Sequence, residues 1–212
     1  MRFVITGVGR SGTMWMAREL ARSRTYIVRH EHADDARGWF RLAGCYDQAG
    51  HLRITAERFR AHDNYGEVNA CLRFIVGDLP VDKRAVIIRN PMDIALSSLN
   101  KFPIRWMGMA GFTERCTALE ADLRQVQKLV DAHYPCFRFE ECTKFPERMV
   151  EIVDWLGLTD VDPLAFRYDE KLNASGREFC SNIAQLLPAH RQALRRACKW
   201  FADIHYPNTW RA

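Results

Sequence analysis

The chain has 212 residues, 48% of them hydrophobic, with a formal net charge of +5 and a pI near 8.9. This length and composition predict one globular domain over residues 1–212 with a substantial core. No apolar run approaches the roughly 18 residues of a membrane-spanning helix, so we expect no membrane partner. The mild positive charge suits either an anionic ligand or a solvated basic surface. Because the chain has no RNA-recognition pattern, zinc spacing or basic arm, we expect no nucleic-acid partner.

The cysteines indicate the compartment. There are seven, scattered along the chain, and none forms a CxxC pair. An odd, dispersed set favours free thiols in a reducing environment. The first apolar run begins at Phe3, which leaves no room for a secretion signal. We therefore expect a cytoplasmic protein.

Apolar patterns predict strands that alternate with helices. Strands are expected at residues 2–6, 26–28, 85–88 and 136–139, and helices at residues 13–22, 67–76, 90–100, 113–133, 144–156 and 188–202. Residues 33–62 are weakly patterned and receive no assignment. The alternation predicts an α/β three-layer sandwich with a central parallel sheet. In such sheets ligands bind beyond the carboxyl ends of the strands, where the loops after Ile5 and Ile88 fall.

Residues 7–13, GVGRSGT, are the most informative stretch because they join a predicted strand to a predicted helix. Glycines let backbone N–H groups turn toward an anion, and the helix N-terminus adds partial positive charge. The first and last glycines have the spacing of an NTPase P-loop, but Thr13-Met14 stands where that loop has Lys-Ser/Thr. Arg10, inside the loop, is the basic residue instead. The loop therefore suits an anion but not Mg-ATP.

A second segment, residues 89–97 with the sequence RNPMDIALS, leaves the most apolar predicted strand and enters a helix. Arg89 offers a fork of donors and Ser97 a hydroxyl, and both suit one phosphate group. Lys101 lies one turn beyond Ser97 on the same helix face. Taken alone, this pattern is also common on protein surfaces.

Together the two segments resemble the signatures of sulfotransferases that use 3′-phosphoadenylyl sulfate (PAPS). In that family a loop of the form G-x-x-[RK]-S-G-T-T wraps the 5′-phosphosulfate, and R-[ND]-x-x-D-x-x-x-S grips the 3′-phosphate. This chain departs from the first signature at Met14, where a second hydroxyl is usual. The resemblance is nearest to the bacterial and tyrosylprotein branches, and it implies a P-loop-like fold, PAPS as sulfuryl donor, 3′-phosphoadenosine 5′-phosphate (PAP) as product, and no metal. The nucleotide-binding residues that it implies are Gly9, Arg10, Ser11, Gly12, Thr13, Met14, Trp15, Arg89, Ser97 and Lys101.

The resemblance continues toward the C-terminus. The segments FRFEE at 137–141 and WLGL at 155–158 are similar to a family segment whose role is structural. NASGR at 173–177 is similar to a loop that closes over the nucleotide, which adds Ser175, Gly176 and Arg177 to the implied contacts; an ordinary polar turn is the alternative. Trp15 occupies the place of an adenine-stacking aromatic residue, and it equally suits the core.

In-line transfer of a sulfuryl group requires a general base near the end of the second predicted strand. Glu31 is the first candidate, by similarity to the carboxylate branches, and His30 is the second because its ordinary pKa suits proton abstraction near pH 7. Arg10 is expected to stabilise the transferring group. Glu67, at a predicted helix start, suits capping or substrate positioning better than base catalysis. His32 is a further candidate for substrate contact, and a lone histidine pair is more often hydrogen-bonded than metal-binding.

The expected reaction moves a sulfuryl group from PAPS to a hydroxyl or amine of a small-molecule, glycan or peptide acceptor. Residues 33–62 and 102–115 are expected to frame the acceptor pocket, although their aromatic and methionine content also suits core packing. Two alternatives remain open. One is a kinase-like phosphotransferase with a degenerate P-loop, and the other is a non-catalytic protein that binds an anion or a nucleotide. The missing Lys-Ser/Thr separates the first alternative from the sulfotransferase, because kinases use Mg²⁺ to screen phosphates.

Overall fold

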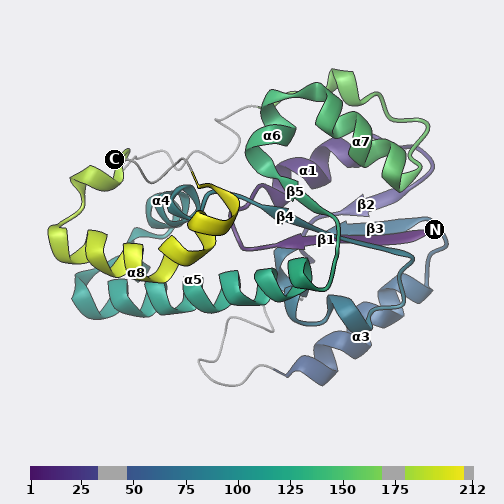
Figure 1. Ribbon diagram of the computed structural model, residues 1–212. Helices are drawn as coiled ribbons and strands as arrows, with labels where there is room; N and C mark the ends of the chain where they lie inside the picture. Colours follow the sequence, from purple (N-terminus) through teal and green to yellow (C-terminus); the bar gives the residue numbers. More distant parts are fainter. Residues whose placement is uncertain (33–46, 169–179, 208–212) are drawn as a thin grey trace. The chain divides into compact units, whose positions relative to one another are not determined.

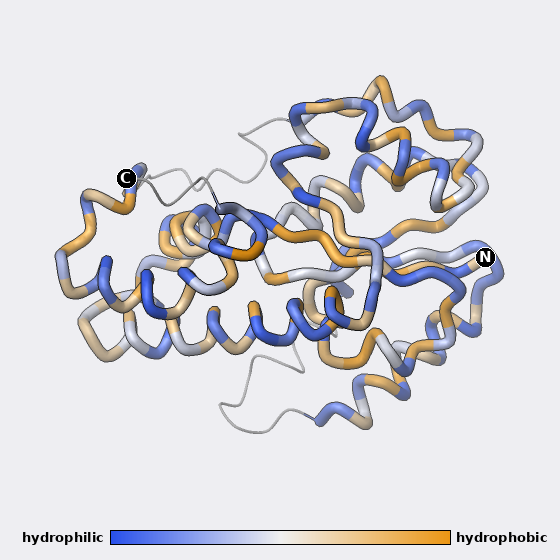
Figure 2. The backbone as a smooth tube through the Cα atoms, in the orientation of Figure 1, coloured by the Kyte–Doolittle hydropathy of each residue, from blue (hydrophilic) through white to orange (hydrophobic). Residues whose placement is uncertain are grey.

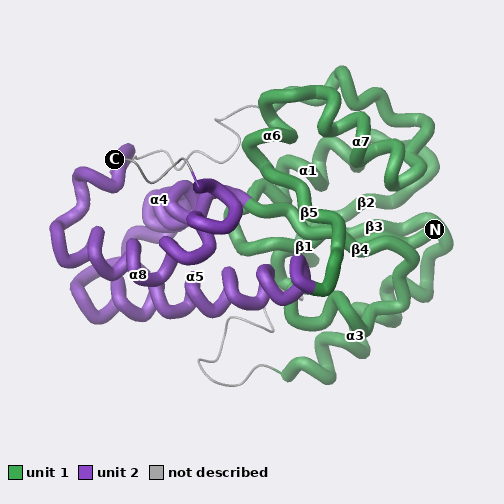
Figure 3. Tube along the Cα trace, in the orientation of Figure 1, with its two compact units in different colours: residues 1–88, 132–168 green, residues 89–131, 169–212 purple. Residues whose placement is uncertain are grey.

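The computed structural model describes residues 1–32, 47–168 and 180–207. The chain forms two compact units, each built from two stretches of sequence (Figure 3). The first unit comprises residues 1–88 and 132–168, and the second comprises residues 89–131 and 169–212. The first unit contains a parallel sheet, whereas the described part of the second is helical.

A five-stranded sheet lies at the centre of the first unit, in the order β2-β3-β1-β4-β5 (Figure 1). All neighbouring strands run parallel. The strands are β1 (Arg2–Gly7), β2 (Ile27–Arg29), β3 (Tyr65–Val68), β4 (Lys83–Ile88) and β5 (Cys136–Arg138). This architecture confirms the predicted α/β fold with a central parallel sheet.

The central strands explain why the sheet is buried on both faces. β1 and β4 carry continuous apolar runs, and their residues from Phe3 to Ile5 and from Ala85 to Ile88 are almost wholly inaccessible to solvent. Figure 2 shows this hydrophobic colouring along the strands. Such runs are typical of parallel strands with helices on both sides.

Helices cover both faces of the sheet in the first unit (Figure 1). One face carries α1 (Thr13–Leu20), α6 (Phe139–Lys144) and α7 (Pro146–Leu156), and the other carries α3 (Gln48–Arg60). On the first face, Phe3 and Ile5 of β1 share one hydrophobic cluster with Leu20 of α1 and Ile152 of α7. This cluster fixes α1, and therefore the loop that precedes it, against the sheet.

The prediction of a helix over residues 67–76 is wrong. The chain forms β3 and then two 3₁₀ turns, Ala70–Phe74 and Val76–Asp78. All four residues of β3 are buried, including the charged Glu67. A carboxylate in a buried strand does not fit the apolar pattern, and the tight turns place apolar residues at a spacing that mimics a helix.

Two other stretches differ from the expected elements. The helix expected over residues 144–156 is α7, which begins at Pro146, and the sequence did not predict the short α6 before it. The two helices are separate because Phe145 is extended and Pro146 cannot continue the preceding hydrogen bonds. Helix α3 occupies a region that received no assignment, and its inward face carries the polar residues His51 and Thr55. An amphipathic pattern based on hydrophobicity does not detect such a face.

The described part of the second unit consists of helices. They are α4 (Pro91–Lys101), a 3₁₀ turn at Pro103–Trp106, α5 (Gly108–Asp131), a 3₁₀ turn at Ile183–Gln185 and α8 (Pro188–His205). α8 packs on both α5 and α4. These three helices were expected from the sequence, at residues 90–100, 113–133 and 188–202. Within residues 1–32, 47–168 and 180–207, no helix is long and apolar enough to cross a membrane.

Candidate phosphate-binding site

The loop after β1 lies where the strand order changes direction. Within the sheet, β2 and β3 lie on one side of β1, and β4 and β5 lie on the other side of it. β1 and β4 pair in parallel, with Gly7 opposite Ile87, so the two strands end at the same edge. Ligands of open parallel sheets bind at such a point. The loops after β1 and β4 therefore lie at one edge of the sheet, where the sequence predicted that a ligand would bind.

The backbone of this loop contains two left-handed residues, a feature of anion-binding nests. Ser11 N–H donates a hydrogen bond to the Val8 carbonyl at 3.1 Å, which closes a turn around Gly9 and Arg10. Arg10 has φ 73° and Gly12 has φ 98°. Left-handed residues among right-handed ones turn successive N–H groups to one side, where they attract an anion. A non-glycine residue such as Arg10 rarely adopts positive φ, and such strain gathers at functional sites.

Two glycines of the loop are required by their surroundings. A side-chain carbon at Gly12 would overlap the ring of Phe139, the first residue of α6. A carbon at Gly7 would overlap the Ile87 carbonyl and press on Ser11 Oγ. Gly9 has nothing within 4 Å of the corresponding position. The open side of the loop is therefore at Gly9.

Ser11 and the start of α1 offer groups that an anion would satisfy. Ser11 is fully buried, and its Oγ has no hydrogen-bond partner. α1 begins directly after Gly12, which supplies no side-chain cap, and the first turn contains no acidic residue. An uncapped helix N-terminus presents N–H groups and partial positive charge to an anion. The residues present therefore fit a phosphate or sulfate group.

His30, the second candidate base, contacts this loop. It follows β2, and its Nε2 lies 3.2 Å from Oγ1 of Thr13. Burial lowers the pKa of His30 from 6.5 to about 4. The imidazole is therefore neutral near pH 7, with a weaker affinity for a proton than an exposed histidine has.

Glu31 and His32 continue from His30 at the same edge of the sheet. Glu31 is exposed and His32 is half-buried, and both lie beyond the last residue of β2. The structure thus places the three candidates of this segment after the strand, rather than within it. Glu31 is the one whose side chain is open to solvent.

Met14 and Trp15, adjacent in the first turn of α1, differ in their exposure to solvent. Trp15 is buried in the core, where its ring meets Phe139 at 5.9 Å and Tyr168 at 6.0 Å between centroids. Its indole N–H donates to the Arg167 carbonyl at 3.0 Å. The sequence allowed two roles for Trp15, adenine stacking and core packing. Its burial favours core packing over stacking on an adenine ring. Met14 is exposed on the same turn.

Glu67 is a buried anchor of the sheet and does not cap a helix. Its carboxylate accepts hydrogen bonds from Tyr65 Oη at 2.9 Å and Asn69 Nδ2 at 3.0 Å, and pairs with Arg58 Nε at 3.1 Å. Burial, and then the nearby Glu67 carboxylate, raise the pKa of the Tyr65 hydroxyl, so this donor stays protonated. With its oxygens engaged inside the protein, Glu67 is poorly placed to contact a substrate.

The sequence did not single out Asn69, which connects this network to the phosphate loop. Asn69 N–H donates to the Ile5 carbonyl at 2.9 Å, and Thr6 Oγ1 donates to the Asn69 carbonyl at 2.9 Å. Thr6 directly precedes Gly7. Since Asn69 also bonds Glu67, the end of β1 is fixed through β3. No motif reveals this role, because it depends on strand pairing.

The second predicted segment opens the second unit. Arg89 follows Ile88, the last residue of β4, and Asn90 caps α4 by accepting a hydrogen bond from Met92 N–H at 3.0 Å. Ser97 is half-buried on α4, and Lys101 is its exposed last residue. Pro91 at the first helical position agrees with the predicted helix start. The third predicted segment, with Ser175, Gly176 and Arg177, lies outside the described residues.

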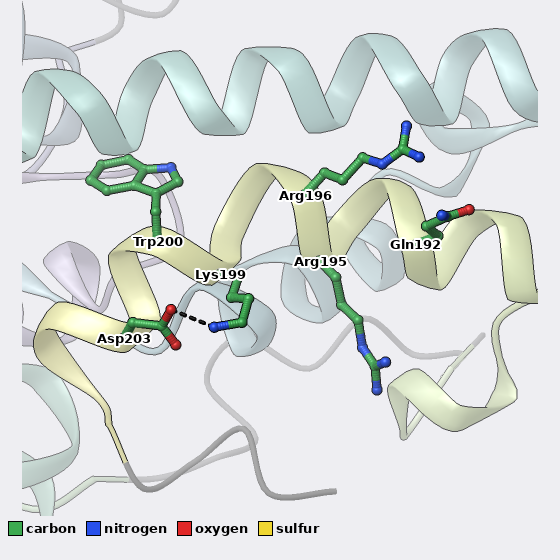
Figure 4. Close-up of a pocket in the computed structure, with 6 residues that line it drawn as sticks. All are labelled: Gln192, Arg195, Arg196, Lys199, Trp200 and Asp203. Carbon is green, nitrogen blue, oxygen red and sulfur yellow. Dashed lines mark hydrogen bonds and ion pairs between the residues drawn. The ribbon is translucent and has the colours of Figure 1, made fainter.

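A separate depression of about 430 Å³ lies on the surface of the second unit. Figure 4 shows its lining, which comes entirely from α8: Gln192, Arg195, Arg196, Lys199, Trp200 and Asp203. It contains none of the residues that the sequence assigned to the nucleotide. Across the ranges that the structure describes, no group of three or more His, Cys, Asp or Glu side chains is arranged to hold a metal ion.

No protein-family model and no curated protein sequence matches the chain. Among solved structures, a sulfotransferase from Alicyclobacillus acidocaldarius is similar, with a TM-score of 0.56 and 16% sequence identity. The similarity covers 94% of this chain and 92% of that chain. At this identity the similarity shows a shared fold. It supports the P-loop-like α/β architecture over nearly the whole length of the chain.

Proposed function

We propose that this chain is a PAPS-dependent sulfotransferase that transfers a sulfuryl group to a hydroxyl or amine of a small-molecule, glycan or peptide acceptor. The observation that carries the proposal is the loop between β1 and α1. It combines left-handed Arg10 and Gly12, the unpartnered buried hydroxyl of Ser11 and an uncapped helix N-terminus. The similar fold of a solved sulfotransferase adds support.

The donor specificity follows from what the loop offers. Its backbone and Ser11 suit an anionic group, and Thr13-Met14 in place of Lys-Ser/Thr removes the hydroxyl that a Mg-ATP site requires. PAPS, when bound, supplies a sulfuryl group that carries less charge than a phosphoryl group. We assign the 5′ end of the donor to residues 9–14 and its 3′-phosphate to Arg89, Ser97 and Lys101.

The chain's own residues then have distinct tasks. Arg10 and the N–H groups at the start of α1 stabilise the charge that develops during transfer. Glu31, exposed beyond β2, is the first choice for removing the acceptor's proton. His30 is the second choice. Its contact with Thr13 and its pKa of about 4 suit it better to orienting the start of α1.

Calorimetry with two ligands tests the donor assignment. PAP should bind without metal, and Mg-ATP should bind more weakly or not at all. Binding of Mg-ATP without PAP would establish the kinase-like alternative. Binding of PAP without transfer of labelled sulfate from PAPS to any acceptor in a cell extract would indicate a non-catalytic protein.

Two variants test the residue roles. Arg89→Ala should weaken PAP binding by about 1.5–3 kcal/mol, the range for hydrogen bonds to charged groups. Glu31→Gln should lower turnover and leave the affinity for PAP nearly intact, as expected of a base. Full activity of Glu31→Gln would transfer the role to His30.

A further inference from the structure

Residues 101–109, from the end of α4 to the first residues of α5, present a group of large apolar side chains to solvent. Within eight residues the exposed fractions are 39% for Phe102, 82% for Ile104, 70% for Met107 and 48% for Met109. Single exposed apolar residues are common on soluble proteins, but a local group of them indicates an interaction surface. The sequence suggested this region as a frame for an acceptor and did not reveal the exposure.

An ordered turn holds these side chains outward. Trp106 is buried, its ring lies 5.0 Å from that of Phe112, and its indole N–H donates to Ser98 Oγ at 3.3 Å. Arg105 N–H donates to the Phe102 carbonyl at 3.0 Å. Trp106 thus anchors the segment to α4 and α5, while Ile104 and Met107 on either side face solvent.

The charged residues within this stretch of sequence, which Asp93 and Glu114 bound, are both positive. Residues 94–113 contain Lys101 and Arg105 and no aspartate or glutamate. The Arg105 guanidinium lies 4.7 Å from the centre of the Phe102 ring. A surface that combines apolar side chains with nearby cations is complementary to an anionic lipid bilayer, which accepts both.

We propose that residues 101–109 bind the surface of a bilayer that contains anionic lipids. Ile104 and Met107 insert among the acyl chains, and Arg105 contacts the headgroups. A second copy of the chain is a less suitable occupant. A two-fold contact would bring Arg105 close to its own copy with no carboxylate in the segment to pair with it. The inference is independent of the proposed reaction, and it differs from the expectation of no membrane partner.

Vesicle binding by the purified full-length chain tests the proposal. The protein is sedimented with vesicles of phosphatidylcholine alone and of phosphatidylcholine mixed with phosphatidylglycerol. Preferential binding to the mixed vesicles is expected. In Ile104→Ser/Met107→Ser the partition coefficient should fall more than about tenfold, because two apolar side chains no longer insert.

A matched control keeps the test specific. Leu164→Ser/Ile204→Ser replaces two apolar residues that are similarly exposed, at 60% and 55%, but lie outside the segment. This variant should bind vesicles like the original protein. Arg105→Gln should reduce the preference for phosphatidylglycerol. Thermal unfolding of each variant checks that it is folded.

Four results would overturn the proposal. The first is absence of binding to phosphatidylglycerol vesicles, and the second is an equal loss of vesicle binding in the control variant. In the third, Ile104→Ser/Met107→Ser retains vesicle binding, whereas Arg195→Gln/Arg196→Gln/Lys199→Gln loses it. That last pattern would assign the binding to the cationic face of α8 in Figure 4. The fourth is a dimer that dissociates in Ile104→Ser/Met107→Ser without vesicle binding, which would make the segment a contact between copies.

Discussion

The Thr13 hydroxyl lies 3.2 Å from Nε2 of His30, which joins the first residue of α1 to the residue that follows β2. The contact places a neutral imidazole beside the N-terminus of a helix, where a positive charge would be unfavourable. Burial also lowers the pKa of His30, to about 4. Protonation of His30 should therefore disturb the end of the phosphate loop, where α1 begins.

Acid should destabilise the protein through His30. The pKa in the folded state, about 4, lies below the ordinary 6.5, so the unfolded chain binds the proton more readily. This contribution to stability is present above pH 6.5 and is lost as the pH falls toward 4. The loss should be no more than about 3 kcal/mol, from the size of the pKa shift.

Urea unfolding at several pH values between neutral and 4 measures this effect. His30→Gln should flatten the pH dependence in that window. His62→Gln, which changes an exposed histidine, should keep the original profile. Equal profiles for His30→Gln and the original protein would show that another group causes the acid sensitivity.

Two glycines of the phosphate loop should respond differently to alanine. Gly12→Ala places a methyl group against the Phe139 ring at a residue with φ 98°. It should destabilise the protein by about 2–4 kcal/mol, the sum of backbone strain and overpacking. Gly9→Ala meets no atom within 4 Å and should cost less than about 1 kcal/mol. Chemical denaturation compares them, and equal losses would contradict the described loop.

The parts of the fold that the sequence predicted well are those with apolar runs. β1 and β4 are continuous buried strands, and α1, α4, α5 and α8 carry amphipathic patterns. β3 was missed because Glu67 is buried at its centre, where Arg58 and Asn69 satisfy its charge. A local pattern does not show that an arginine of the preceding helix α3 will compensate a buried carboxylate.

Ser11→Ala should separate ligand binding from stability. The buried hydroxyl has no partner in the protein, so its removal should change the free energy of unfolding by less than about 1 kcal/mol. PAP affinity should fall by about 1.5–3 kcal/mol, because a hydrogen bond to a charged group is lost. Ser23→Ala is the control, since Ser23 Oγ bonds Asp160 at 2.9 Å. It should lose stability and keep its affinity for PAP.

The candidate site was predictable only where residues are adjacent in sequence. The loop from Gly7 to Thr13 is contiguous, and its left-handed residues agree with a phosphate-binding turn. The contact of His30 with Thr13 and the support of Thr6 by Asn69 depend on strand order. Trp15 could not be assigned from its position, because Tyr168, which packs against it, is far away in sequence.

Glu67→Ala should be among the most destabilising substitutions of a charged residue. It removes the acceptor of Tyr65 and Asn69 and leaves the largely buried Arg58 without its counter-charge. Breaking a buried ion pair in this way costs about 3–5 kcal/mol. Glu57→Ala is the control, because Glu57 pairs with Arg53 on the exposed face of α3 and should lose no more than about 1 kcal/mol.

If Glu67→Ala does not fold, Tyr65→Phe provides the measurement. It removes one hydrogen bond to the same carboxylate and should cost about 0.5–3 kcal/mol. Because Glu67 bonds Asn69, which holds Thr6 at the end of β1, the loss should also weaken PAP binding. The double variant Tyr65→Phe/Asn69→Ala should show coupling beyond the sum of the single effects. Strict additivity would contradict a network centred on Glu67.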